Sequence, residues 1–498
     1  MRKGYVHAHL YNRKETAFLI DEGKFVKFGS DEEITKLTGH DELVDLGGMF
    51  VLPGFVDSHM HLAELGMYLS NLQLSNLSDQ ALLAEKIVNR AKADTEAEWI
   101  TGRGWKANVD KKFLDSLPVD KPVALTRVDG HVMAVNSKAL EAAGIESDLE
   151  IDGGYLDFDK GIAEEKAMDV IRAHFPEPGE NLIRSYIELG AKAANQYGVT
   201  TVGSDDFVAV TKDYTKILPV FSTMAYTESL HVRVNEQCEF NSTQEFAGFL
   251  DQGYTSFTGD DFFMIGPLKL IIDGTLGAKT AAVSKPFTGG STGTLIMDEN
   301  EIETYVQLAN RFNMATITHV IGDRALDAVL SVFKDNVLEG NPLHHGLVHV
   351  QLTRPDQLEE IQKLGLSCFI QTPFLEDDLP LLNTVPEEIS DSSYAFRTLF
   401  ESVLTSNGSD APVCMPDVIH GIALAVNGNR EGQNLTREEA IASYTTKGAE
   451  QLFMADRIGA LQENYYADFV VLDQDLLTCE DIEKTKVMMT VMNGETVF

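Results

Sequence analysis

Residues 54–65, GFVDSHMHLAEL, follow an apolar run that opens with Met49, and they set His59 and His61 one residue apart where that run ends. Residues i and i+2 of a β-strand point to the same side, so both imidazoles can face one interior. A structural protein would place a turn at this point. The stretch therefore predicts a buried strand that ends in two potential metal ligands.

Seven further runs are continuously apolar, which is typical of buried parallel strands, and amphipathic helical patterns separate them. They read GVTTVGSDD (198–206), HVRV (231–234), LKLIIDG (268–274), ATITHVIGD (315–323), GLVHVQ (346–351), LSCFIQTP (366–373) and VLTSNGSDAP (403–412). With the strand near Asp57 they make eight. We therefore predict an α/β fold with a (β/α)8 TIM-type barrel, whose functional side chains lie at the carboxyl ends of the strands.

The two ends of the chain have a different pattern, with short alternating strands, turns and too few apolar residues for a core of their own. We expect residues 1–52 and 455–498 to pair into one small β-sandwich, and residues 53–454 to form the barrel. The stretch at about 65–198 is far longer than one crossover and carries its own helix and strand patterns. We expect it to be an insertion over the barrel mouth.

The charge of the chain limits its partners. It has 498 residues, with 40 Lys and Arg against 77 Asp and Glu, and a formal net charge of −37. This charge repels phosphate backbones and anionic membrane surfaces, so neither nucleic acid nor a membrane is an expected partner. The four cysteines show no short pairing, and no apolar run of about 18 residues predicts a membrane helix. We expect a cytoplasmic protein with a small-molecule ligand and, if it assembles, a homodimer.

Six polar side chains stand near the ends of five predicted strands. They are His59 and His61 on the first, Lys269 on the fourth, His319 on the fifth, His349 on the sixth and Asp410 on the eighth. Each alone has an ordinary structural explanation, but six in the order of one barrel point to a site. Imidazoles and a carboxylate converging on the barrel axis would bind a divalent metal such as zinc. Lys269 stands out because burying an ammonium costs several kcal/mol unless it is paired or chemically altered.

Several motifs carry a family resemblance. LPGFVDSHMHL, KLIIDGTLGAKTA, THVIGDRA, HVQ, GSDAP and, in the insertion, VDGHVMAVNSKAL resemble the amidohydrolase superfamily, in the YtcJ-like branch that includes N-substituted-formamide deformylases. The resemblance covers nearly the whole chain. It implies that the four histidines are metal ligands, that Asp410 is a ligand and moves protons, and that Lys269 is N-carboxylated by carbon dioxide and bridges two ions. Gly346 and Val348 depart from the pattern, because relatives often carry charged residues there.

The resemblance also implies an activity. We expect a hydrolase of non-peptide carbon–nitrogen bonds with one or two divalent ions, zinc first, a metal-activated water and a linear amide or N-substituted formamide as substrate. His131 is a second catalytic candidate that could polarise the substrate carbonyl. Two alternatives stay open. One is a deaminase or cyclic-amide hydrolase on the same scaffold, and the other is a non-catalytic regulatory protein.

Overall fold

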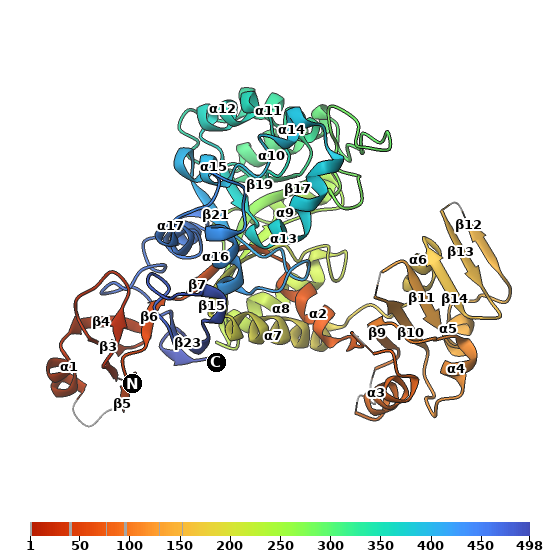
Figure 1. Ribbon diagram of the computed structural model, residues 1–498, viewed down its shortest axis with the longest axis horizontal. Helices are drawn as coiled ribbons and strands as arrows, with labels where there is room; N and C mark the ends of the chain where they lie inside the picture. Colours follow the sequence, from red (N-terminus) through yellow and green to blue (C-terminus); the bar gives the residue numbers. More distant parts are fainter. Residues whose placement is uncertain (1, 39–41, 76, 94–96, 129, 152) are drawn as a thin grey trace. The chain divides into compact units, whose positions relative to one another are not determined.

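The computed structural model describes residues 2–38, 42–75, 77–93, 97–128, 130–151 and 153–498 (Figure 1). The chain divides into two compact units, one made of Met1–Gly66 with Ile183–Phe498 and the other of Met67–Leu182. The stretch interpreted from the sequence as an insertion, about 65–198, also includes helix α7 (Glu180–Gln196), which belongs to the larger unit from Ile183 onward.

Eight parallel strands form the centre of the larger unit, which confirms the predicted barrel. Around the sheet they are β7 (Phe55–Met60), β15 (Val199–Ser204), β16 (Arg233–Cys238), β17 (Phe263–Ile271), β18 (Thr316–Val320), β19 (Gly346–His349), β20 (Ser367–Ile370) and β21 (Thr405–Asn407). The last strand returns beside the first, where the Ser58 hydroxyl donates to the Asn407 carbonyl at 2.9 Å and the Asp410 N–H donates to the His59 carbonyl at 2.8 Å.

One strand differs from its prediction. The third predicted strand ended at Val234, but β16 continues to Cys238 and buries Asn235, Glu236 and Gln237. Polar residues inside a buried strand need partners, and here Asn235 donates to the Leu452 carbonyl and Gln237 to the Ser58 carbonyl. The extension brings polar side chains to the end of the barrel where His59 lies.

Helices pack around the barrel strands (Figure 1). The longer ones are α2 (Leu62–Ser70), α7, α8 (Tyr214–Tyr226), α9 (Thr243–Asp251), α10 (Glu299–Arg311), α11 (Asp323–Asn336), α12 (Pro355–Leu364) and α16 (Val418–Asn427). Shorter ones are η1 (Thr372–Phe374), α13 (Leu375–Asp378), η2 (Leu379–Thr384), α14 (Glu387–Ser390), α15 (Phe396–Ser402), α17 (Arg437–Ser443), α18 (Thr446–Gln451) and η3 (Ile482–Lys484). Helix α11 is representative, because it buries Leu326, Val329 and Phe333 while Lys334 and Asp335 face solvent.

Both ends of the chain contribute to one five-stranded sheet. Its order is β2 (His9–Leu10), β6 (Phe50–Pro53), β22 (Phe469–Leu472), β23 (Val487–Met492) and β24 (Glu495–Thr496), and β6 pairs antiparallel with β22. A four-stranded sheet of β4 (Lys24–Gly29), β3 (Ala17–Asp21), β1 (Lys3–Val6) and β5 (Glu42–Asp45) lies with helix α1 (Asp31–Thr38). The two sheets share a core in which the ring of Phe469 lies 5.2 Å from those of Tyr5 and Phe18.

The smaller unit has its own sheet and core. The sheet order is β12 (Leu149–Ile151), β13 (Gly154–Asp157), β14 (Ile162–Glu165), β11 (Val132–Val135), β10 (Val123–Arg127), β9 (Ile100–Trp105) and β8 (Leu72–Gln73). Its helices are α3 (Gln80–Ala93), α4 (Lys111–Asp115), α5 (Ser137–Ala142) and α6 (Ala167–Arg172). Trp105 is a core residue here, and its Nε1 donates to the Leu125 carbonyl at 2.9 Å.

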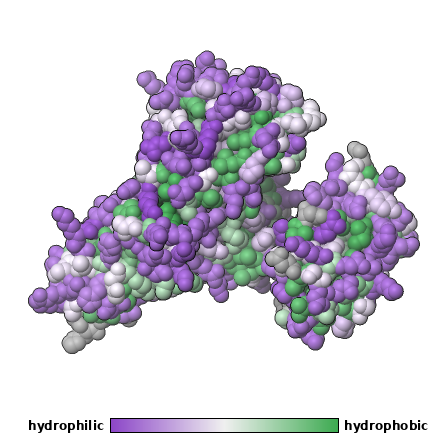
Figure 2. Space-filling view, in the orientation of Figure 1, coloured by the Kyte–Doolittle hydropathy of each residue, from purple (hydrophilic) through white to green (hydrophobic). Residues whose placement is uncertain are grey.

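The surface reflects the charge of the chain. Figure 2 shows hydrophilic residues over most of the visible face, in keeping with the excess of Asp and Glu. Among the described residues, none of the helices combines the length and the apolar character that crossing a bilayer requires.

Candidate metal centre

The structure brings the six predicted ligands to one place in the barrel. Asp410 is central, because its Oδ1 lies 3.2 Å from the Nε2 of His59 and 3.2 Å from the Nε2 of His61. The Nζ of Lys269 lies 3.2 Å from the same Nε2 of His59. The rings continue from there, with centroids 5.7 Å apart for His59 and His349 and 4.6 Å apart for His349 and His319.

The strand geometry explains this convergence. His59 lies in β7, His319 in β18 and His349 at the end of β19, while Asp410 follows β21 in the turn that bonds back to His59. All are near carboxyl ends of parallel strands, which meet at one face of a barrel. The Lys269 and His59 side chains are only 1% exposed, whereas that of His61 is 21% exposed, so solvent reaches the site on the side of His61.

Each of the four imidazoles is held at its Nδ1 by an oxygen. The partners are Gln237 Oε1 for His59 at 2.6 Å, the Asp205 carbonyl for His61 at 2.6 Å, Gln371 Oε1 for His349 at 2.7 Å and Asp273 Oδ1 for His319 at 3.1 Å. The contact at His319 is close but is not aligned as a hydrogen bond, unlike the other three. An oxygen that can only accept requires a proton on Nδ1, which leaves the Nε2 lone pair free.

Two glutamine amides could in principle be turned the other way, but their second contacts fix them. Gln237 Nε2 donates to the Ser58 carbonyl at 2.9 Å, and Gln371 Nε2 donates to the Phe369 carbonyl at 3.1 Å. A carbonyl only accepts, so the Oε1 atoms must face the histidines. Histidines held through one nitrogen by an oxygen, with the other nitrogen presented to a common point, are typical of metal ligands.

Asp273 connects the site to the loops around it. Its carboxylate accepts hydrogen bonds from the main-chain N–H groups of Ala282, Ile321 and Gly322 at 2.7–3.1 Å, and it faces His319. It therefore holds the loop that contains Ala282 and the turn after β18 next to His319.

The surroundings shift the pKa values of His59 and His61 in opposite directions. Burial, with the charge of Lys269, lowers the pKa of His59 to about 4. Burial also opposes protonation of His61, but the hydrogen bond to Asp410 and the charge of Asp205 outweigh it and raise the pKa of His61 to about 10. For Asp410, burial raises the pKa, but the two histidines beside its Oδ1 outweigh burial and hold the pKa well below the usual range. The carboxylates thus favour positive charge at this point.

The residues present fit a divalent ion. The ligand atoms of His59, His61 and Asp410 lie within 4.8 Å of one another. Zinc binds nitrogen and oxygen ligands at about 2.0–2.2 Å, so ligands of one ion stand about 3–4 Å apart. Imidazole nitrogen and carboxylate oxygen are also the donors that such ions take.

Comparison with known proteins agrees with this geometry, because the model of the amidohydrolase family matches residues 42–498. The chain belongs to the amidohydrolase family. It is 27% identical to the putative amidohydrolase YtcJ of Bacillus subtilis, over 99% of this chain and 98% of that protein. It is 22% identical to the N-substituted formamide deformylase of Arthrobacter pascens, over 96% and 94% of the two chains. An uncharacterized metal-dependent hydrolase from Pyrococcus furiosus matches its structure with a TM-score of 0.82 and 26% identity, over 96% of this chain and 100% of that one. The protein is a metal-dependent hydrolase of this family.

The sequence did not single out four residues that position the histidines of this amidohydrolase, namely Asp205, Gln237, Asp273 and Gln371. Three of them lie in motifs that predicted strand ends, at GSDD, LIIDG and FIQTP. Their signal is an oxygen-bearing side chain directly after a buried strand. Gln237 had no such signal, because the strand was predicted to end three residues before it.

His131 of this amidohydrolase is in the smaller unit, apart from the six residues above. It precedes β11, its side chain is 67% exposed, and its Nδ1 lies 3.1 Å from the Glu165 carboxylate. Its catalytic role stays a prediction.

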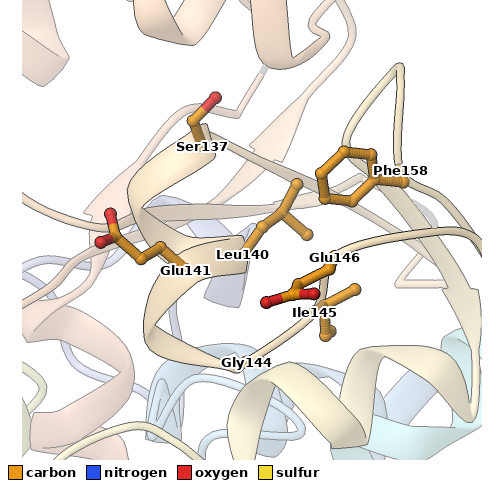
Figure 3. Close-up of a pocket in the computed structure, with 7 residues that line it drawn as sticks. All are labelled: Ser137, Leu140, Glu141, Gly144, Ile145, Glu146 and Phe158. Atoms are coloured by element: carbon orange, nitrogen blue, oxygen red, sulfur yellow. The ribbon is translucent and has the colours of Figure 1, made fainter.

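The smaller unit also has a hollow of its own beside α5, which Figure 3 shows. It is lined by Ser137, Leu140, Glu141, Gly144, Ile145, Glu146 and Phe158. None of these seven is a histidine, cysteine or lysine, and the Ser137 hydroxyl already donates to Asp115 at 2.6 Å.

Proposed function

We propose that this amidohydrolase hydrolyses a linear amide or an N-substituted formamide with one or two divalent ions, zinc first. The six residues that would hold the ions are His59, His61, Lys269, His319, His349 and Asp410. One observation carries the proposal: the imidazoles of His59 and His61, held at Nδ1 by oxygens, present their Nε2 atoms to the buried Asp410 carboxylate.

Lys269 would act after carboxylation. The amine nitrogen of its neutral form would attack carbon dioxide, form an N–C bond and release a proton, which turns a buried cation into an anionic oxygen ligand. The position of Lys269 supports this step, because its side chain is 1% exposed and its Nζ lies 3.2 Å from the Nε2 of His59. An ammonium ion would repel a metal ion at that nitrogen.

Divalent ions in this site would polarise the amide carbonyl and lower the pKa of a water from about 15.7 towards about 7. Asp410 would take the proton from the attacking water and deliver it to the leaving nitrogen. Its Oδ1 lies 3.2 Å from the Nε2 atoms of both His59 and His61. The backbone of Asp410 has φ of 56°, a conformation that costs energy outside glycine, and its N–H bond to His59 holds it there.

His131 would be a second catalytic group that polarises the substrate carbonyl. The Glu165 carboxylate supports this role, because it lies 3.1 Å from Nδ1 and orients the ring.

The test is a substrate panel with the protein loaded with zinc or manganese. It should contain N-alkyl and N-aryl formamides, linear acyl amides, cyclic amides and aminated heterocycles. We expect release of a carboxylate and an amine from the first two classes, and loss of that activity in His59→Asn. The control is His174→Asn, an exposed histidine of the smaller unit, which should keep full activity.

Other outcomes would identify the alternatives. Ammonia release from a heterocycle, or opening of a cyclic amide, with one ion per chain and with activity retained in Lys269→Ala, would replace the proposal by a deaminase or cyclic-amide hydrolase. No turnover of any class by a metal-replete sample would replace it by a non-catalytic regulatory protein.

A further inference from the structure

Asp205 is a buried carboxylate that the described residues do not satisfy. Its side chain is 1% exposed, and neither of its oxygens accepts a hydrogen bond within the described parts of the chain. The nearest cation is Lys269, whose Nζ lies 3.6 Å from Oδ2. Charge-assisted hydrogen bonds to carboxylates are about 2.7–2.9 Å long, so this contact is too long to be one. Leaving a buried carboxylate in this state costs several kcal/mol unless another positive group faces it.

The next residue shows what a satisfied carboxylate looks like at the same place. Asp206 is equally buried, but its Oδ2 accepts from the Ser204 hydroxyl at 2.6 Å and its Oδ1 accepts from the Ala63 N–H at 2.8 Å. Asp206 therefore has a structural role that needs nothing from outside the chain. Asp205 has no such role.

The main chain of Asp205 is fixed against the strand that carries His59 and His61. Its N–H donates to the Met60 carbonyl at 2.9 Å, and its carbonyl accepts from His61 Nδ1 at 2.6 Å. Because both main-chain groups are held, the position of the carboxylate beside Lys269 is a property of the fold.

We propose that Asp205 is a direct ligand of the metal centre, a seventh group beside the six that the family resemblance assigns. This inference rests on the proposed metal centre and deepens it.

The charge of Lys269 supports this role. Carboxylation would convert the Lys269 ammonium, which lies 3.6 Å from Asp205 Oδ2, into an anion. Two buried anions would then stand side by side, and a divalent ion between them would satisfy both. With Asp205, Asp410 and the carbamate the site holds three negative charges, which two divalent ions and one hydroxide balance.

The first test measures metal binding without turnover. The metal-stripped protein is titrated with zinc against a competing chelator, for the wild type, Asp205→Asn and Asp206→Asn. Loss of a group that only orients a ligand costs about 10–100-fold in affinity, so loss of a direct ligand should cost about 100-fold or more for one ion. Asp206→Asn is the matched control, since it changes the adjacent buried carboxylate, and its zinc affinity should stay within about threefold of the wild type.

The second test looks for a new absorption band and does not depend on a loss of metal affinity. In Asp205→Cys loaded with cobalt(II), a thiolate in contact with the ion gives sulfur-to-cobalt charge-transfer absorption that the wild type lacks. Circular dichroism of each variant before metal addition checks the fold, and the cobalt spectrum still decides the matter if Asp205→Asn does not fold.

The outcomes separate the two proposals. A loss of about 100-fold or more in Asp205→Asn, or the new absorption in Asp205→Cys, supports Asp205 as a ligand. A smaller loss without that absorption overturns this inference alone, provided that the wild type binds zinc. A wild type that binds neither zinc nor cobalt overturns the proposed metal centre, and this inference with it.

Discussion

Two neighbouring barrel strands each bury one cationic side chain, and the two side chains differ in how completely they are paired. Arg233 opens β16, and its guanidinium donates to both oxygens of Asp468 at 2.7 and 3.2 Å and to the Asp261 carbonyl at 2.8 Å. It also lies 4.0 Å from the centre of the Tyr466 ring. Among the described residues, the polar contacts of Lys269, near the other end of β17, are the 3.2 Å contact to His59 and the 3.6 Å contact to Asp205.

The difference separates stability from chemistry. A fully paired buried cation holds elements together, and Arg233 connects the barrel to Asp468, which precedes β22. A buried cation with few partners, such as Lys269, indicates a site where a further group reacts or binds, such as carbon dioxide or a metal ion. This division matches the barrel, whose amino-terminal face supports stability and whose carboxyl-terminal face carries catalysis.

The largest expected effect is on turnover at Lys269. Lys269→Ala should lower kcat/KM at least about 1,000-fold, because an anionic ligand is lost and a factor of ten corresponds to about 1.4 kcal/mol of barrier. Added acetate or propionate should restore part of the rate by supplying a carboxylate in the space of the side chain. Steady-state kinetics with and without the acids measure both effects. Activity within tenfold of the wild type would remove Lys269 from the metal centre.

Arg233 should show the reverse pattern. Arg233→Met leaves Asp468 buried and unpaired, so the free energy of unfolding should fall by about 3–5 kcal/mol, measured by denaturant titration. The double variant Arg233→Met, Asp468→Leu should regain much of this loss, since no lone charge remains. Zinc bound per folded molecule should not change in either variant. If zinc binding fell in step with stability, the two cations would not have separate roles.

His345, directly before β19, and His349, at the end of β19, offer the same comparison between a structural and a candidate functional residue. His345 is buried ahead of the strand, where its Nδ1 accepts from the Thr316 N–H at 3.1 Å, the opposite of His349. Burial lowers the pKa of His345 from 6.5 to about 4. The folded state thus binds its proton less tightly than the unfolded state, so this contribution to stability is complete above pH 6.5 and is lost as the pH falls towards 4.

The expected size is about 3 kcal/mol over that window. Between pH 7 and pH 4, the free energy of unfolding from denaturant titrations should fall by about this amount more in the wild type than in His345→Gln. An equal fall in the two proteins would show that His345 does not titrate with folding.

The smallest effect concerns the groups that orient the ligands. Gln371→Ala removes the acceptor at His349 Nδ1 and should weaken zinc binding about 10–100-fold, equal to about 1.4–2.7 kcal/mol. Chelator competition measures it. Gln252→Ala is the control, because Gln252 hydrogen-bonds to Tyr214 and Gly248 away from the ligands. Equal affinities in the two variants would mean that the amide only fills space.

The barrel and the positions of the candidate ligands at its strand ends could be predicted because their signals are local. An apolar run that ends in a polar residue is visible in a few positions, and the i and i+2 spacing of His59 and His61 states which way they face. The roles of Lys269 and Asp410 came from family resemblance, since one residue in a strand does not reveal its chemistry. The end of β16 was misplaced because Asn235 and Gln237 are polar, and only distant partners allow them to be buried.

The groups that hold the histidines could not be predicted, because their partners are far away in sequence. Gln237 and His59 are 178 residues apart, and the register of β16 and β7 against β15, the strand between them, decides that they meet. The satisfied Asp206 and the unsatisfied Asp205 look identical in sequence. Only the positions of Ser204 and Ala63 distinguish them.

The pairing of β6 with β22 has a consequence for synthesis. Strand β6 is synthesised early, but its partner β22 is translated more than 400 residues later. Until Asp468 emerges, Arg233 has no counter-ion and β6 is an open edge that can pair with other chains. A nonsense mutation shortly before Ala467 would therefore yield a nascent chain with every proposed metal ligand present, but with a barrel prone to aggregation.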